Sequence, residues 1–195
     1  LLGALSGLQN ATGTMMVKGH PVPLSGKGAN GQTRRRAGIA HVPEDRQRDG
    51  LVMDFTAWEN TAFGYHRDPG GMLMNNTALR AKARSSMDNF DIRPPDIQLA
   101  ARNFSGGNQQ KIVLAREIEQ NPDILLVGQP TRGVDIGAIE FIHAQILRLR
   151  DAGKAIILIS VELDEIMALS DRIAVMFDGR IMGERFPDQT NEAEL

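Results

Sequence analysis

Apolar residues in the first hundred positions come in short runs, separated by stretches rich in glycine, proline and charge. Apolar residues at helical spacing predict a helix, and a short apolar run bounded by turn residues predicts a strand. On this basis we expect helices at 1–7, 56–66 and 77–90, strands at 13–18 and 37–42, loops at 20–33 and 43–50, a turn at 67–72, and an irregular segment at 91–96. Pro94 and Pro95 disfavour a helix in that last segment.

The second half of the chain alternates strands with helices more regularly. We expect helices at 106–119, 138–150 and 162–169, strands at 124–127 and 155–160, and a hairpin at 172–186. The helix at 138–150 has Ile139, Ile142, Ile146 and Leu149 on one face. An Asp-Gly pair divides the last segment, which is a strong hairpin signal. The alternation predicts an α/β fold with a mostly parallel core sheet and a C-terminal β-hairpin.

Composition narrows the class of protein only slightly. The net charge of −2 over 195 residues argues against a nucleic-acid partner. The lack of cysteine excludes disulfides and thiolate metal sites. No apolar run reaches the roughly 18 residues that a membrane-spanning helix needs. The first residues, LLGALSG, lack an initiator methionine and read as the end of a helix, so we expect the sequence to begin inside a domain.

The most informative segment is NFSGGNQQK at 103–111, where Ser105 and two glycines precede a long amphipathic helix. Serine is a preferred helix N-cap, and that structural role alone would explain Ser105. A serine hydroxyl, backbone N–H groups and a helix N-terminus together also suit a phosphate. The two interpretations are compatible, because a capped helix start can still receive an anion.

This segment resembles the LSGGQ signature of ABC-type ATPases, and the motifs around it follow that family's order. ILLVGQPTRGVD (124–135) resembles the Walker B strand and D-loop, and AIILIS followed by VELDEI (155–166) resembles the switch strand and helix. AGIAHVPEDRQRDGL (37–51) resembles the Q-loop region of sugar and nucleoside importers. Together, these motifs point to the second ATPase half of a tandem importer subunit.

The resemblance implies a fold and a domain organisation. We expect a P-loop NTPase-like domain of the ABC ATPase kind that is partial over 1–195, with a helical subdomain at 51–107, an α/β core at 108–186 and a tail at 187–195. Its Walker A region is missing: SGKG at 25–28 has Pro21 where the motif's first glycine belongs, and Gly28 where its Ser/Thr belongs.

Four positions that carry the family's chemistry hold other residues here. The Walker B aspartate aligns with Gly128, and the catalytic glutamate with Gln129, whose amide cannot accept a proton from water although it can orient one. The switch histidine aligns with Val161, and the Q-loop glutamine with Glu44, whose charge would repel phosphate. These replacements imply a domain that hydrolyses ATP poorly and has no metal ligands of its own.

The residues of the signature itself are largely retained. We therefore expect this domain to contribute its signature to ATP that is bound by the Walker motifs of a second domain. In an ABC pair each ATP lies between the Walker motifs of one domain and the signature of the other. The nucleotide-binding residues that we expect here are Ser105, Gly106, Gly107, Asn108, Gln109, Asp135 and Glu44. Asn108 keeps the amide of the usual glutamine on a shorter side chain, and Asp135 caps a helix or acts as the D-loop aspartate, or does both.

The resemblance also implies cofactors, partners and location. ATP and Mg²⁺ would be shared with a partner ATPase half. Transmembrane permease subunits would receive the coupled motion, and a periplasmic or extracellular solute-binding protein would act indirectly. The chain would lie in the cytoplasm, on the inner face of the plasma membrane.

Two other functions compete with the importer interpretation. A chromosome-maintenance or repair ATPase shares the signature, but such proteins carry long heptad coiled coils, and 51–104 shows no sustained heptads. The third possibility is a purely structural dimerisation module that does not bind nucleotide.

Several other residues have an ordinary structural interpretation. His20, His41, His66 and His143 lack metal-ligand spacing. The run Arg34–Arg36 is expected to form a solvated face. Phe55, Trp58, Phe63 and Tyr65 are expected in the core, although some could line a groove for a helix of the membrane subunit.

Overall fold

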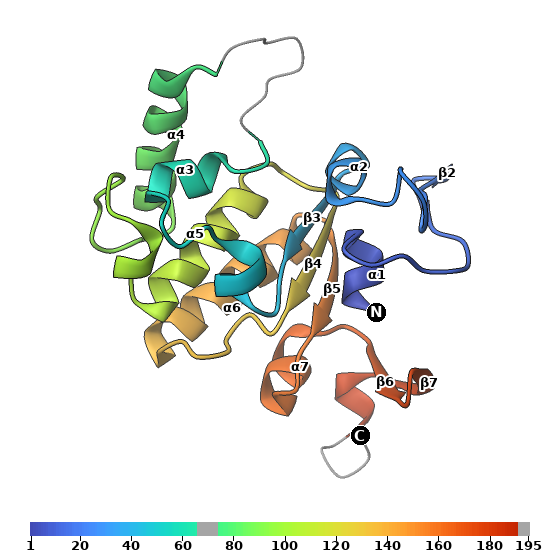
Figure 1. Cartoon of the computed structure of the whole chain (residues 1–195). Coiled ribbons are helices and arrows are strands. Elements are labelled where there is room, and N and C mark those ends of the chain that lie inside the picture. The colour runs from blue at the N-terminus through green and yellow to red at the C-terminus, as the bar shows by residue number, and fades with distance from the viewer. Residues whose placement is uncertain (66–73, 191–195) are drawn as a thin grey trace.

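The computed structural model describes residues 1–65 and 74–190 as an α/β fold built around a small parallel sheet (Figure 1). The sheet has the order β3-β4-β5, with β3 (Ile39–Val42) and β5 (Ala155–Ile159) flanking β4 (Ile124–Gly128). All of its strands run parallel, and Val42, Val127 and Leu158 share one register level. The predicted fold class and the three core strands are therefore confirmed. Within the described residues, one edge of β5 has no neighbouring strand.

Helices cover one face of this sheet and a smaller N-terminal group covers the other. The first layer comprises α5 (Gly106–Ile118) and α6 (Ile136–Asp151), with α3 (Ala57–Ala62) and α4 (Asn76–Asn89) packed beyond α5. Its core includes Ile112, Val113, Leu114, Leu125, Ile142 and Ile146, each at most 2% exposed. On the opposite face, α1 (Leu2–Ser6) contributes Leu2 to a cluster with Ile39 and Leu126. Burial on both faces accounts for the nearly continuous apolar runs of β3 and β4, whereas β5 is only partly buried.

A buried polar network fixes α5 against the segments before and after α3. The Glu117 carboxylate pairs with the guanidinium of Arg116, at 2.8 Å, and accepts a hydrogen bond of 2.6 Å from the Tyr65 hydroxyl. Arg116 also donates to the carbonyl oxygens of Gly50 and Asn60. The two charged side chains are 4% and 1% exposed, so the pair is desolvated and depends on these additional hydrogen bonds.

Burial around this network shifts two neighbouring titratable groups. Burial and the nearby charge of Glu117 raise the pKa of Tyr65 well above its ordinary value, which keeps the phenol protonated as a donor. Burial lowers the pKa of His41 to about 4, so its imidazole is neutral at pH 7. Neither residue adds a charge beside the pair.

The N-terminal segment corrects two of the sequence predictions. Where a loop was expected at 20–33, the chain forms β2 (His20–Pro21), which pairs with β1 (Met16–Val17), and α2 (Gly31–Arg36) begins before that range ends. The expected solvated face is wrong for Arg34, which is 2% exposed. Its guanidinium donates to the carbonyl oxygens of Leu5, at 2.8 Å, and Pro23, at 2.7 Å. Buried carbonyl groups need donors, and this arginine supplies them.

The remaining elements follow the predicted order with small changes. The predicted helix at 162–169 is α7 (Leu163–Leu169), and the hairpin consists of β6 (Ile173–Phe177) and β7 (Arg180–Arg185). The predicted loop at 43–50 contains a turn of π-helix at Arg46–Gly50, capped by the Asp45 carboxylate. Short 3₁₀ turns lie at Ala101–Asn103 and Pro187–Gln189. The predicted turn at 67–72, with His66, lies outside the described residues.

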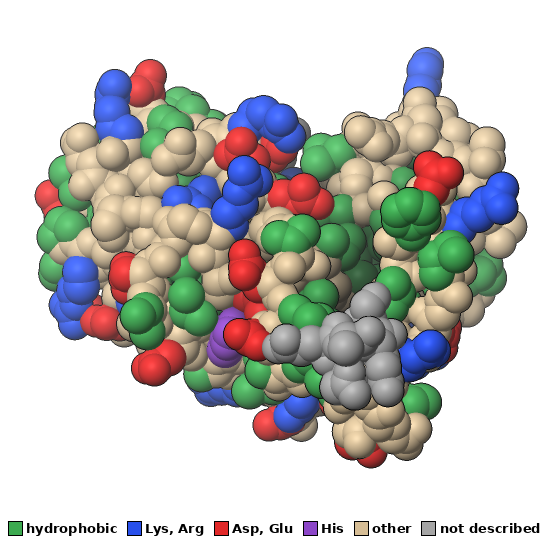
Figure 2. All heavy atoms as spheres, turned by 90° about the horizontal axis from the view of Figure 1, so that it is seen from below, with side chains coloured by type: hydrophobic (Ala, Val, Ile, Leu, Met, Phe, Trp, Pro, Cys, Tyr) green, Lys and Arg blue, Asp and Glu red, His purple; other side chains and the backbone are tan. Residues whose placement is uncertain are grey.

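Several large apolar side chains stay exposed. The prediction of core packing holds for Trp58, which is 7% exposed, and is wrong for Phe55 and Phe63, which are 42% and 46% exposed. A second exposed set lies on β5 and the hairpin: Ile157, Met176, Phe177, Ile181 and Met182. Figure 2, which views the molecule from below, shows hydrophobic side chains around a hollow on this face. None of the described helices is long and apolar enough to cross a bilayer.

Candidate functional site

Glu44, Gly128, Gln129 and Val161 lie together at the carboxyl ends of the parallel strands. Gly128 ends β4 and Gln129 follows it, while Glu44 lies two residues after β3 and Val161 two residues after β5. The shared register of the three strands brings these positions to one edge of the sheet. We call Glu44, Gly128, Gln129 and Val161 the strand-end cluster. This edge is where open α/β sheets place their ligands.

Gly128 has no room for a side chain in this arrangement. A Cβ atom built there would lie 2.6 Å from Cγ of Glu44 and 2.6 Å from Cδ2 of Leu2. The Glu44 and Leu2 side chains therefore fill the space that any larger side chain at Gly128 would need. This packing explains why the residue at the end of β4 is a glycine.

Gln129 adopts an unusual backbone conformation for a residue with a side chain. Its φ angle is 46°, in the left-handed region, and its N–H donates to the Ile159 carbonyl at 2.8 Å. Left-handed backbone in a non-glycine residue is uncommon and concentrates at functional positions. The sharp turn sends the chain from β4 into the loop that leads to Asp135.

The strand-end cluster does not fit a resident Mg²⁺ ion. Glu44 is its one carboxylate, Gln129 offers an amide oxygen, and Gly128 and Val161 offer no side-chain oxygen. Mg²⁺ in phosphate sites usually needs one or two well-placed carboxylates together with the phosphate oxygens. Across residues 1–65 and 74–190, no three His, Cys, Asp or Glu side chains come together as metal ligands.

The signature segment (103–111) presents a different chemistry. Ser105 is exposed and caps α5, since its hydroxyl oxygen accepts from the Asn108 backbone N–H. The first turn of α5 holds no acidic residue. The N–H groups of Gly106 and Gly107 have no acceptor within the helix, because they belong to its first turn. An exposed hydroxyl at the start of a helix whose own first turn carries no acid suits an anion, with the Asp135 carboxylate of the neighbouring loop beside Gly107.

Close contacts explain why both residues after Ser105 are glycines. A Cβ atom at Gly106 would lie 2.7 Å from Nη2 of Arg46 and 2.7 Å from the Gly133 carbonyl oxygen. A Cβ atom at Gly107 would lie 2.9 Å from Cβ of Ala138 and 2.9 Å from Oδ2 of Asp135. The signature segment is therefore packed directly against the loop between β4 and α6.

Gly106→Ala should destabilise the protein by about 1–3 kcal/mol, because the new methyl group displaces the arginine and the neighbouring backbone. Equilibrium unfolding in denaturant measures this loss. Gly137→Ala is the matched control: a Cβ atom there meets only Oδ1 of Asp135 at 3.6 Å, so stability should hold or rise slightly. Equal losses in the two variants would contradict the close contact at Gly106.

The other predicted residues of this segment have distinct placements. The Asn108 amide bonds to both Ser105 and Arg93. Gln109 is 3% exposed, and its amide donates to the Ala101 and Phe104 carbonyls, which gives it a structural role. Asp135 is exposed and accepts from the Ala138 N–H at 2.9 Å, so it caps α6 as one of its two expected roles requires.

Arg46 is the residue of this region that the sequence analysis missed. Its guanidinium donates to the Arg132 carbonyl at 2.7 Å and to the Gly133 carbonyl at 3.2 Å. Arg46 lies two residues after Glu44 and contacts the start of α5, so it joins the strand-end cluster to the signature segment. The charged run EDRQRD was visible in the sequence, but it gave no signal for these two carbonyl partners.

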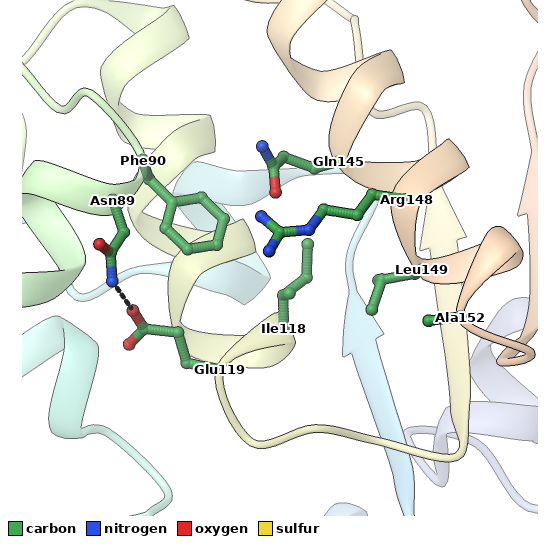
Figure 3. A pocket seen from close by; sticks show the side chains of 8 residues that line it. All are labelled: Asn89, Phe90, Ile118, Glu119, Gln145, Arg148, Leu149 and Ala152. Carbon is green, nitrogen blue, oxygen red and sulfur yellow. Dashed lines mark hydrogen bonds between the residues drawn. The ribbon is translucent and has the colours of Figure 1, made fainter.

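A cavity of the described part of the chain lies apart from these residues. It has a volume of about 410 Å³ and is lined by the C-terminal parts of three helices, α4, α5 and α6. Figure 3 shows Gln145 and Arg148 reaching toward it from α6, while Asn89 and Glu119 are joined by a hydrogen bond on another wall. It lies at the opposite end of α5 from Ser105, about 20 Å away at 1.5 Å of rise per residue.

Comparison with known proteins shows what the chain is similar to. A protein-family model described as ABC transporter matches residues 1–132. The guanosine import ATP-binding protein NupO of Bacillus subtilis (strain 168) is 45% identical over 194 residues, which cover 96% of this chain and 38% of that protein. The nucleoside import ATP-binding protein NupA of Lactococcus lactis subsp. cremoris (strain MG1363) is 45% identical over 190 residues, 94% of this chain and 38% of NupA. The chain thus spans about 38% of the length of these relatives.

Solved structures agree on the fold. The ATP-binding cassette MJ0796, in a dimeric post-hydrolysis state bound to ADP and Pi, superposes with a TM-score of 0.79. The alignment covers 95% of this chain and 78% of that chain, at 22% sequence identity. A nucleotide-free ATP-binding cassette from an ABC transporter gives a TM-score of 0.77 at 20% identity, covering 95% of this chain and 74% of that chain.

Proposed function

Because the chain belongs to the ABC transporter family, we propose that it is part of the ATP-binding subunit of an importer for a nucleoside or a simple sugar. In this proposal it supplies the signature segment to ATP held by a partner ATPase domain, and it hydrolyses ATP poorly itself. We call this role the lid role. The observation that carries it is the contrast between the exposed, acid-free signature segment and the strand-end cluster.

The signature segment supports the lid role through its exposure at Ser105 and its close packing at Gly106 and Gly107. Ser105 is exposed at the start of a helix that is otherwise almost entirely buried. Arg46 donates to the carbonyls of Arg132 and Gly133, and this loop packs closely against Gly106 and Gly107 at the helix start. A pre-positioned set of donors binds a phosphate without first losing much conformational entropy.

The strand-end cluster supports the second half of the proposal. Hydrolysis needs a group that accepts the proton of the attacking water, and loss of such a base costs roughly 10²–10⁴-fold in rate. Gln129 occupies that position and cannot accept the proton, although its amide can still orient a water. Val161, at 79% exposed, offers no hydrogen bond to a phosphate from its side chain. ATP and Mg²⁺ would therefore be held chiefly by residues of the partner domain.

The proposed class of transported solute rests on the names of the relatives. NupO is a guanosine importer component and NupA a nucleoside importer component by name. Other relatives are named for glucose, xylose and ribose import. We therefore propose a nucleoside or a simple sugar as the transported solute, with the solute-binding protein acting only through the permease.

We propose that a membrane-embedded permease is the partner to which closure of the two ATPase domains is transmitted. Phe55 and Phe63 flank α3 and are 42% and 46% exposed, which leaves large apolar side chains free for a partner. A surface that exposes large aromatic side chains is suited to a protein partner. In this proposal the chain lies in the cytoplasm against the inner face of the membrane.

Titration of labelled ATP into the partner ATPase domain, with and without this chain, tests the lid role. We expect the chain to raise the partner's ATP affinity and its rate of hydrolysis, and to show little turnover alone with Mg²⁺. Unchanged affinity and rate would favour a nucleotide-independent dimerisation module. Brisk turnover by the chain alone would contradict the assignment of the strand-end cluster.

A further inference from the structure

We infer that Asn108 is a positioning residue, which directs the hydroxyl hydrogen of Ser105 outward toward a phosphate oxygen of the bound nucleotide. This inference rests on the lid role and adds to it the reason why Ser105 acts as a donor. It assigns Asn108 a function through Ser105 rather than through its own contact with ATP.

The orientation of the Asn108 amide follows from its second partner. Oδ1 of Asn108 lies 2.7 Å from the backbone nitrogen of Arg93. A backbone N–H can only donate, so the oxygen of the amide must face Arg93. The NH₂ group must then face the other way, where it lies 2.9 Å from Oγ of Ser105.

This arrangement fills the acceptor positions of the Ser105 hydroxyl. Its oxygen accepts from Nδ2 of Asn108 at 2.9 Å and from the Asn108 backbone N–H at 3.4 Å. A serine oxygen has two lone pairs, and both are now directed toward Asn108. Among the described residues, no acceptor is recorded for the hydroxyl hydrogen, and Ser105 is exposed. The hydrogen therefore points to the surface.

A ligand at this position must then be an acceptor. Phosphate oxygens are strong acceptors, and hydrogen bonds to charged groups are about twice as strong as neutral ones. A ligand that presents only N–H or O–H donors would find no lone pair available on Ser105. The geometry thus selects an anion through the polarity of one hydroxyl group.

Asn108→Asp isolates this effect because the two side chains have nearly the same shape. The aspartate can still accept from the Arg93 N–H, but it cannot donate to Ser105. The Ser105 hydrogen would turn inward to the new carboxylate, and a lone pair would face the ligand. Asn103→Asp is the matched control, since Asn103 is an exposed asparagine two residues before Ser105 and has no recorded side-chain hydrogen bond. It adds the same charge nearby without changing the hydroxyl's partners.

The experiment measures the ATP affinity of the partner domain in the presence of each variant chain. We expect Asn108→Asp to reduce the gain in affinity by about tenfold or more, and Asn103→Asp to reduce it far less. Equal effects of the two substitutions would overturn the inference while leaving the lid role standing. A wild-type chain that gives no gain in affinity would remove the lid role, and the inference with it.

A double-mutant cycle separates positioning from general stability. Asn108→Ala should weaken the gain in affinity in the wild-type background and have no further effect once Ser105→Ala is present. If Asn108 mattered only through its hydrogen bond to the Arg93 N–H, Asn108→Ala would lower the gain in affinity equally in both backgrounds. An undiminished effect of Asn108→Ala beside Ser105→Ala would therefore assign Asn108 to the fold and overturn the inference.

Discussion

Ser105→Glu should abolish the ability of this chain to raise the ATP affinity of its partner domain. The glutamate would place a carboxylate at an exposed helix start, where the proposed ligand carries negative charge itself. It would also remove a hydroxyl donor, and one hydrogen bond to a charged group contributes about 1.5–3 kcal/mol. Labelled-ATP titration of the mixture measures the effect.

Two further variants show whether the loss is specific to this position. Ser105→Ala removes the donor without adding charge, so it should weaken the gain in affinity and leave part of it. Ser85→Glu makes the same change on the exposed surface of α4 and should leave the gain intact. A full gain in affinity with Ser105→Glu would refute contact between this serine and the phosphates.

Glu117→Ala should lower the free energy of unfolding by about 3–5 kcal/mol, because it leaves the buried Arg116 guanidinium without its carboxylate. The substitution also removes the acceptor of the Tyr65 hydroxyl. Equilibrium unfolding in urea, followed by circular dichroism, measures this change. Few substitutions outside the apolar core should cost this protein as much.

An exposed ion pair provides the comparison for this prediction. Arg150 and Asp151 lie 2.9 Å apart with side chains 37% and 67% exposed, so Asp151→Ala should change stability very little. Glu117→Gln keeps an oxygen toward Arg116 but loses the charge, and its stability should fall between wild type and Glu117→Ala. Similar stabilities for Glu117→Ala and Asp151→Ala would show that the buried pair contributes little.

The elements that the sequence predicted well are those whose pattern is local. Strands β4 and β5 are uninterrupted apolar runs, and α6 shows its buried face through Ile142 and Ile146. The hairpin is signalled by Asp178 and Gly179, both of which adopt positive φ angles. Each of these signals lies within the element itself, so a single sequence suffices to read it.

The features that the sequence missed depend on partners far away in the chain. Arg34 is buried because the carbonyl of Leu5, 29 residues earlier, accepts its hydrogen bond. Arg46 bonds to carbonyls 86 and 87 residues later. Phe55 and Phe63 look like core residues by composition, but the fold leaves them exposed. No local pattern identifies such long-range acceptors or the side of a short helix that remains uncovered.

The sequence identified which residues form the candidate site, but it did not predict how their side chains pack and point. The alignment of motifs identified Glu44, Gly128, Gln129 and Val161, and parallel strands bring them to one edge. The packing of the Glu44 side chain against Gly128 required the structure. So did the orientation of the Asn108 amide, because it depends on the Arg93 N–H.

One edge of β5 pairs with no other strand among the described residues, and this has a practical consequence for work with this polypeptide. Its amide and carbonyl groups face outward along one side, with the apolar Ile157 exposed beside them. Such an edge is a template onto which a second polypeptide can add a strand, and concentrated samples should form aggregates through it. Nucleotide titrations should therefore be run dilute, after light scattering has established that the sample is monodisperse.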